Sequence, residues 1–150
     1  MNELQQITCP ASYVYSIPGD GNCQFSALSW ACYGTMNRQR SIRHAVCDYI
    51  EENWDVYKES VTDNDLNYVS RMRHDGQWGD NITLDAFCNC YGLSVAVLRP
   101  NDKPWFFSPR GTSVEGVNDY RTVVYSNGHY NACDPWFTKP TLHYIDKWRT

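Results

Sequence analysis

The sequence predicts an α+β (α/β) fold, in which helices come first and a small, mostly antiparallel β-sheet follows. Up to residue 92, apolar residues recur at helical spacing, whereas short β-branched and aromatic runs follow one another after it. The dipeptide Asn127-Gly128 between two such runs favours a tight β-hairpin. The chain has 150 residues, the length of one domain, and we expect a single domain over residues 1–150.

Four helices are expected in the first 92 residues. The first spans 23–33 and the last spans 81–91, and each is followed by a glycine that can end a helix. The second lies within 38–53, and the third follows Thr62 and Asp65, which resemble an acidic capping box. The apolar positions that set the spacing are Phe25, Leu28, Ala31 and Cys32; Ile42, Ala45, Val46, Tyr49 and Ile50; Leu66, Val69 and Met72; and Leu84, Phe87, Cys88 and Tyr91.

The strands are expected after Gly92. Residues 93–98 (LSVAVL) form an apolar run ended by Pro100, which is typical of a buried strand, and 105–107 (WFF) is predicted to be a second. Residues 120–126 and 129–133 are predicted to form a hairpin with a type I′ turn, because Asn-Gly readily takes positive φ angles.

Composition excludes several classes of function. The net charge is −4 and no Lys/Arg block is present, so we expect no nucleic-acid partner, since binding phosphates requires a basic face. No apolar run approaches the roughly 20 residues of a membrane span, and the first ten residues lack the features of a signal peptide. Seven cysteines without a C-x-x-C pair favour reduced thiols and a cytoplasmic protein. Cys88 and Cys90 lack zinc-site spacing, so no metal or cofactor is expected, and we expect a monomer.

The stretch PGDGNCQFSALSWA (18–31) places Cys23 between a turn and a helix. At a helix start, free N–H groups and the helix dipole favour a thiolate, and cysteine pKa values there can fall to roughly 3.5–7.5. Glycines at 19 and 21 allow a tight turn whose uncovered N–H groups could hold a developing oxyanion. The position is also compatible with a cysteine that merely begins a helix.

A cysteine nucleophile needs a base and a group that orients the base. Among four histidines, His129 opens a predicted strand, and Asn131 lies two residues on, so both side chains point to the same strand face. The other three, His44, His74 and His143, are predicted to lie in a polar helix face, a charged loop and the tail. His129 with Asn131 matches the Cys-His-Asn arrangement of thiol proteases.

Three blocks of the chain resemble the ovarian tumour (OTU) family of cysteine proteases. Asp20-Gly21-Asn22-Cys23, with Phe25, Ala27 and Leu28, resembles its nucleophile motif, and His129-Tyr130-Asn131 its histidine motif. Between them, Gln77-Trp78-Gly79-Asp80, with Ile82, Leu84 and Ala86, resembles its Trp-Gly segment. The blocks occur in the family's order over residues 18–133.

The resemblance implies a papain-like fold with the sheet between helical regions, and cleavage after the C-terminal glycine of ubiquitin or a related modifier. Cys23 would be the nucleophile, His129 the general base and acid, and Asn131 its orienting residue. Asp20 would shape a loop, including Gly21 and Asn22, whose N–H groups form the oxyanion hole with that of Cys23. Trp78 and Tyr130 would wall the substrate-tail channel or serve in the core.

Three departures bear on specificity rather than chemistry. Gln24 stands where the family more often has an apolar residue, Ser26 where it often has Arg or His, and Asp80 replaces the second Gly of Trp-Gly-Gly. Alternatives left open are an inactive ubiquitin-binding module, a viral polyprotein-processing protease and an unrelated Cys-His transferase. A compact chain of this kind is compatible with a viral protease or an effector acting in the host-cell cytoplasm, or with an excised catalytic domain.

Overall fold

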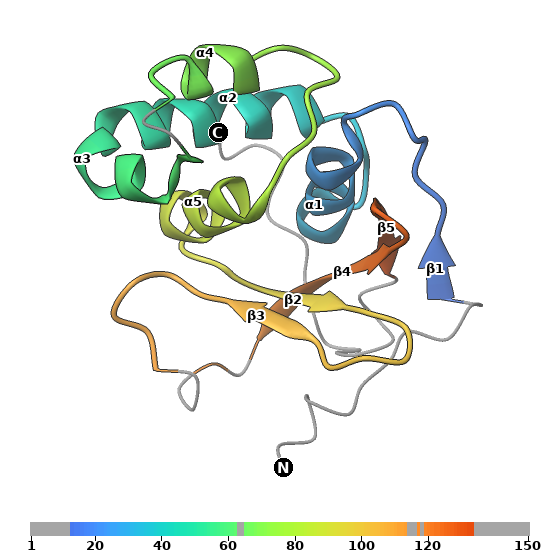
Figure 1. Cartoon of the computed structure of the whole chain (residues 1–150). Helices are drawn as coiled ribbons and strands as arrows, with labels where there is room; N and C mark the ends of the chain where they lie inside the picture. Colours follow the sequence, from blue (N-terminus) through green and yellow to red (C-terminus); the bar gives the residue numbers. More distant parts are fainter. Residues whose placement is uncertain (1–12, 63–64, 114–116, 118, 134–150) are drawn as a thin grey trace.

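A computed structural model describes residues 13–62, 65–113, 117 and 119–133, and its five-stranded sheet has the order β1-β5-β4-β2-β3 (Figure 1). The strands are β1 (Val14–Tyr15), β2 (Ser94–Leu98), β3 (Trp105–Phe107), β4 (Tyr120–Ser126) and β5 (His129–Cys133). Only β2 and β4 pair in parallel, and the other three pairings are antiparallel. The mostly antiparallel sheet is therefore confirmed.

The four predicted strands and their hairpin are confirmed, and β1 is an addition. Asn127 and Gly128 have φ angles of 54° and 75°, as a type I′ turn requires. Strand β1 could not be predicted from the residue pattern, because a two-residue strand is too short to display an alternating pattern.

The described helices pack on one face of the sheet (Figure 1). They are α1 (Cys23–Tyr33), α2 (Gln39–Glu52), α3 (Trp54–Tyr57), α4 (Tyr68–Met72) and α5 (Asn81–Tyr91), with a 3₁₀ turn at Lys58–Ser60. A helical region on the opposite face, which a sheet between helical regions would need, is not found among the described residues. Within those same residues, no helix has both the length and the hydropathy needed to cross a bilayer.

The predicted bounds of α1 and α5 are confirmed, but the capping box before α4 is wrong. α4 begins at Tyr68 after Asn67, and Leu66 is 82% exposed. Asp65 instead accepts a hydrogen bond from the Asn67 N–H and pairs with Arg71. The Asp65 carboxylate therefore forms a local Asx turn instead of the helix cap that the sequence predicts.

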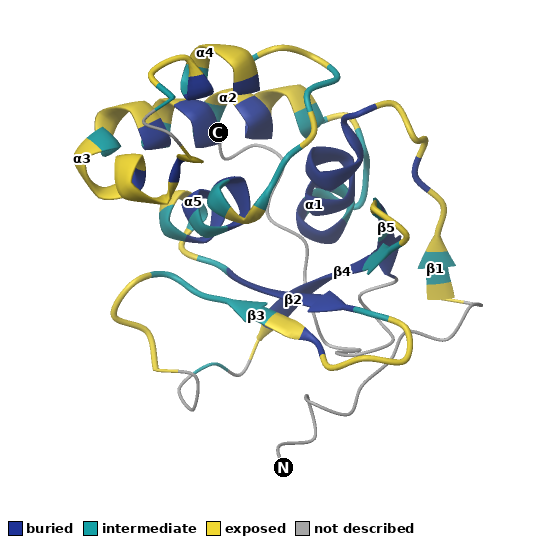
Figure 2. Ribbon diagram, in the orientation of Figure 1, coloured by how far each residue is buried: buried dark blue, intermediate teal, exposed yellow. Residues whose placement is uncertain are grey.

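Helix α1 lies at the centre of the main core, between the sheet and α2. Nearly every side of it is buried, which Figure 2 shows as a dark blue coil. The main core joins α1, α2 and α5 to one face of the sheet, where Val95, Val97 and Val123 point inward. A smaller cluster around Leu98 and Val124 covers the other face. This packing fixes the start of α1 against β5.

Candidate active site

A tight turn leads into Cys23, and its backbone touches a second loop. Gly21 has a φ of +84°, and a Cβ atom there would lie 1.9 Å from the Gly76 carbonyl oxygen. Both the conformation and the space therefore require glycine. The Asp20 Oδ1 accepts a hydrogen bond from the Asn22 N–H at 3.0 Å, which closes the turn.

The backbone N–H and the side-chain oxygen of Asn22 are both engaged in internal hydrogen bonds. Its N–H is engaged by Asp20, so the expectation that this N–H is uncovered for an oxyanion is wrong in this structure. Its side-chain oxygen accepts from Arg43 and from the Gly76 N–H at 2.7 and 2.8 Å. The N–H groups of Cys23 and Gln24 at the start of α1 point toward the Cys23 sulfur, beside which an oxyanion would form, and they are the remaining candidate donors.

Cys23 begins α1 as predicted, but burial governs its thiol. The side chain is 1% exposed, and desolvation raises the pKa of the Cys23 thiol from its usual value. Hydrogen bonds from the backbone N–H groups of Tyr130, Gln24 and Cys23 itself act in the opposite direction, and the charge of Asp20 adds to the rise. The helix-start effect is present but smaller than desolvation, so the expectation of a depressed pKa is not met in the resting protein.

His129 and Asn131 lie together at the start of β5, as their spacing predicts. The His129 Nε2 is 3.0 Å from the Asn131 Oδ1 and 2.8 Å from the Ile17 carbonyl oxygen. The Asn131 Oδ1 also accepts from the Ile17 N–H at 2.9 Å, which identifies that atom as the amide oxygen. Because Nε2 faces two acceptors, it carries the proton in the neutral ring, and Nδ1 has the free lone pair.

The structure brings the candidate nucleophile and base to one place. The Tyr130 N–H donates to the Cys23 sulfur, so the sulfur lies against β5 one residue from His129. On the other side, a Cβ atom at Gly19 would be 3.9 Å from the His129 Nδ1, so this nitrogen lies close to the turn before Cys23. The Asp20 carboxylate, in contrast, accepts a hydrogen bond from the Asn22 N–H and not from His129.

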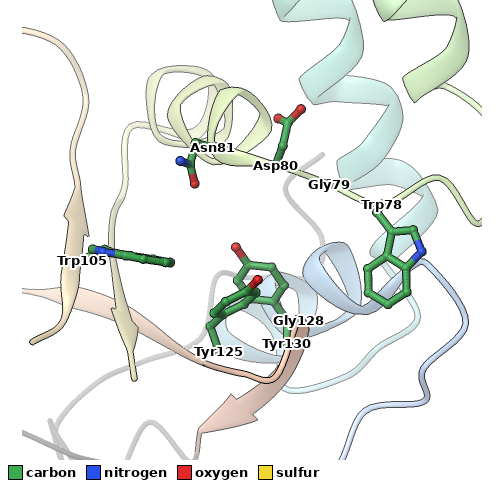
Figure 3. Close-up of a pocket in the computed structure, with 8 residues that line it drawn as sticks. All are labelled: Trp78, Gly79, Asp80, Asn81, Trp105, Tyr125, Gly128 and Tyr130. Carbon is green, nitrogen blue, oxygen red and sulfur yellow. The ribbon is translucent and has the colours of Figure 1, made fainter. Parts of the chain in front are cut away.

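A pocket of about 420 Å³ is rich in aromatic rings, and it is lined by Gly128 and Tyr130, the chain neighbours of His129, but not by Cys23 or His129 themselves (Figure 3). Trp78 and Tyr130, the residues expected to wall a channel, both line it, together with Trp105, Tyr125 and Asn81. Trp78 is 47% exposed, whereas Tyr130 is buried, and burial raises the pKa of Tyr130 to about 12. Trp78 thus lines the pocket from the protein surface, whereas Tyr130 lines the pocket and is also part of the core.

Two of the departures from the family pattern are coupled in space. The Gln24 Oε1 accepts from the Thr83 hydroxyl at 2.6 Å, and its Nε2 donates to the Asp80 carbonyl at 3.1 Å. The Asp80 carboxylate caps α5 by accepting from the Thr83 N–H, and it also accepts from the Tyr68 hydroxyl. A buried amide at 24 therefore ties α1 to the start of α5, where Asp80 serves as N-cap.

Sequence reasoning missed two contributors to this site. Ile17 holds both His129 and Asn131 through its backbone, which no side-chain pattern reveals. Arg43 is 1% exposed and bonds to Asn22. A signal for Arg43 existed, since it shares the buried stripe of α2 with Ile42, Val46 and Cys47. In the described residues, no three His, Cys, Asp or Glu side chains are grouped so that they could hold a metal ion.

Residues 18–130 match the family model described as "OTU-like cysteine protease". The chain belongs to the OTU-like cysteine protease family. Among similar proteins, the OVARIAN TUMOR DOMAIN-containing deubiquitinating enzyme 10 of Arabidopsis thaliana is 31% identical over 116 residues, covering 77% of this chain and 33% of that protein. Deubiquitinating enzyme 12 of the same species is 28% identical and covers 93% and 64%. The chain thus spans from about a third to under two thirds of these two relatives.

Solved structures of OTU domains share the fold. The OTUD1 OTU domain matches with a TM-score of 0.68 at 21% identity, covering 80% of this chain and 83% of that one. An OTU domain solved in complex with ubiquitin matches with a TM-score of 0.68 at 16% identity, covering 88% and 77%. The α+β OTU fold is therefore confirmed.

Proposed function

We propose that this OTU-like protease is a thiol-dependent deubiquitinase. It hydrolyses isopeptide or peptide bonds after the C-terminal glycine of ubiquitin, and related modifiers are further candidate substrates. The family description names a cysteine protease, and the relatives carry the name deubiquitinating enzyme. An OTU domain of the same fold has been solved with ubiquitin bound.

The observation that carries the proposal is the geometry around His129, whose Nε2 lies within hydrogen-bond distance of two oxygen acceptors, so that we assign the ring proton to Nε2. The His129 Nε2 then donates to the Ile17 carbonyl and the Asn131 Oδ1, so Nδ1 is a base in the neutral ring. We assign Cys23 as nucleophile, His129 as general base and acid, and Asn131 as the residue that orients the imidazole. Asp20 has a supporting role, shaping the turn before Cys23.

The reaction proceeds in two steps, acylation of Cys23 and hydrolysis of the resulting thioester. The Cys23 Sγ attacks the glycine carbonyl carbon while the thiol proton passes to the His129 Nδ1, which is required because burial raises the thiol pKa. The oxyanion is received by the N–H groups at the start of α1. His129 then gives its proton to the departing lysine Nζ or α-amine, and the C–N bond breaks. Water attacks the thioester with the help of His129, which frees the ubiquitin carboxylate and the Cys23 thiol.

The aromatic pocket beside His129 is the proposed channel for the substrate tail. Trp78 and Tyr130 would wall it, and glycines at the end of the tail would pass where larger side chains cannot. Gly79 and Gly128 also line the pocket, and they leave backbone exposed to an extended peptide. Ubiquitin or a ubiquitin-like protein with its conjugates is the proposed partner.

The decisive test is hydrolysis of a ubiquitin C-terminal fluorogenic amide, with Cys23→Ala as the control. The wild type is expected to turn over the amide and Cys23→Ala to lose turnover with an unchanged circular dichroism spectrum, because alanine fits a buried helix start. Turnover retained in Cys23→Ala would exclude Cys23 as nucleophile.

The same samples separate the alternatives. A folded wild type that binds ubiquitin without turnover would instead be the binding module, and cleavage of a peptide junction without ubiquitin would favour the polyprotein protease. A single domain over 1–150, the monomeric state and a cytoplasmic location, in a host cell if the protein is viral or an effector, stay predictions.

A further inference from the structure

The most unusual polar side chain outside the reacting groups is Arg43 on α2. It is 1% exposed and is the largest fully buried side chain in the described part of the chain. Its Nη1 donates to the Met72 carbonyl at 2.8 Å, and its Nη2 donates to the Asn22 Oδ1 at 2.7 Å. The Phe25 ring lies 4.4 Å from its guanidinium carbon.

All of these partners are neutral. Among the described residues, no carboxylate forms a salt bridge with Arg43, and its Nε has no hydrogen-bond partner. Desolvation lowers the pKa of the Arg43 guanidinium even though the charges of Cys47, Asp75 and Asp20 act in the opposite direction, so its burial is costly. A methionine of similar length would fill the same core space at lower cost. A purely space-filling role therefore does not account for arginine at this position.

The two terminal nitrogens of the Arg43 guanidinium bond to two different loops at once. The Nη1 bonds to Met72 at the end of α4, and the Nη2 bonds to Asn22 in the turn before Cys23. The Gly21 carbonyl lies 3.5 Å from the same Nη2, on the side opposite to the Asn22 N–H, which donates to Asp20. The Gly21–Asn22 peptide is thus held from both sides.

This peptide sets the direction of the next one along the chain. The Asn22 carbonyl accepts from the Ser26 N–H at 2.9 Å, the first hydrogen bond of α1. Because the N–H and C=O of a peptide unit point in opposite directions, the Cys23 N–H then points out of the helix start. A rotation of Asn22 would turn that N–H away from the carbonyl under attack.

We propose that Arg43 is a positioning residue that locks Asn22 and thereby aims the N–H groups at the start of α1 toward the oxyanion. The inference rests on the proposed function for its catalytic part. Arg43 does not touch the reacting atoms, so its loss affects the stabilisation of the oxyanion and leaves the thiol and the substrate surface in place.

The test compares Arg43→Lys with Arg121→Lys. A lysine at 43 keeps the charge but cannot reach both Met72 and Asn22. Arg121 is a matched control, because it is also buried, has an unpaired Nε and donates to a backbone carbonyl of α1, that of Ala31, at the other end of the helix. Both variants lose a hydrogen bond from a buried arginine, but only Arg43→Lys loses one that holds the turn before Cys23.

The kinetic readout separates the oxyanion from the thiol. On the ubiquitin amide, Arg43→Lys is expected to lower kcat roughly 10- to 100-fold with KM within about twofold, which is less than the roughly 10²- to 10³-fold loss that follows removal of an oxyanion donor, because the donor is misaligned rather than removed. Alkylation of Cys23 by iodoacetamide passes through no oxyanion, and peptide mapping identifies the alkylated cysteine. In Arg43→Lys, the alkylation rate is expected to stay within about twofold of the wild-type rate at each pH. Equal loss in hydrolysis and alkylation, or the same kcat loss in Arg121→Lys, would mean a merely structural role and overturn the proposal.

A second readout needs no substrate. The Gly76 N–H donates to Asn22 and the Asn22 N–H to Asp20, so residue-resolved hydrogen exchange reports the lock directly. Arg43→Lys is expected to exchange faster at these two amides while α5 and β4 keep their protection. Unchanged exchange at both amides overturns the proposal even if the wild type fails on ubiquitin, a failure that would count against the proposed function alone.

If Arg43→Lys does not fold, Asn22→Ala releases the turn while Arg43 stays in place. It is expected to lower kcat to a similar extent with unchanged alkylation of Cys23. Wild-type kcat in Asn22→Ala would refute the lock.

Discussion

At the scale of single residues, the orientation of the His129 ring depends on two oxygen acceptors, of which the Asn131 Oδ1 also binds a second donor. The Asn131 Oδ1 accepts from both the His129 Nε2 and the Ile17 N–H, so this atom orients the ring and ties it to the chain entering the turn. The Ile17 carbonyl remains as a second acceptor for Nε2. Asn131→Ala is therefore expected to lower kcat on the ubiquitin amide by about tenfold, and His129→Ala by roughly 10²- to 10⁴-fold, because the latter removes the base itself.

Asn131→Asp is the matched control, since a carboxylate keeps the oxygen that accepts from both donors. It is expected to retain more activity than Asn131→Ala when the three variants are assayed together. Equal losses in Asn131→Ala and His129→Ala would make Asn131 as essential as the base. No loss in Asn131→Ala would assign the orienting role to the Ile17 carbonyl.

At the scale of elements, the site depends on two loops that touch through their backbones. The turn before α1 and the loop between α4 and α5 meet at Gly21 and Gly76. Gly21→Ala would place its Cβ 1.9 Å from the Gly76 oxygen, so the loops must separate. We expect lost turnover and a free energy of unfolding lower by more than the roughly 1–2 kcal/mol of a left-handed alanine.

Gly111→Ala separates strain from contact. Gly111 has a similar φ of +81°, but nothing lies within 4 Å of the added Cβ. Urea unfolding and amide hydrolysis of the two variants should show the conformational cost in both and the loss of activity in Gly21→Ala only. Full activity in Gly21→Ala would show that the contact between the loops is dispensable.

At the scale of the whole molecule, the sequence predicted what local pattern determines. The bounds of α1 and α5, the strands and the 127–128 turn follow from spacing and turn chemistry, and so does the pairing of His129 with Asn131 on one strand face. The contributions that depend on the assembled core could not be predicted in this way. Burial raises the Cys23 pKa only once β5 packs over α1, and the backbone of Ile17 meets His129 only through the strand pairing of β1.

The assembled core also makes the fold sensitive to alkaline pH. Three fully buried cysteines lie in α1, α2 and α5, and burial raises their pKa values from 9.0 to about 12 for Cys32, about 11 for Cys47 and about 12 for Cys88. These thiols ionise above pH 9 in the unfolded chain but stay protonated in the folded one. The unfolded state then binds fewer protons, so the free energy of unfolding falls as pH rises.

Between pH 8 and 10 the loss is roughly 1.4 kcal/mol per thiol, or about 4 kcal/mol for the three thiols, against a total stability of roughly 5–15 kcal/mol. Urea unfolding under reducing conditions is expected to give a constant free energy between pH 7 and 8 and this drop by pH 10. Cys32→Ala removes one of these thiols, so its stability should be lower at neutral pH but decline less steeply as the pH rises. A free energy that stays level from pH 7 to 10 would mean that water reaches these thiols in the folded state, and the packing around α1 would then be looser than the structure has it.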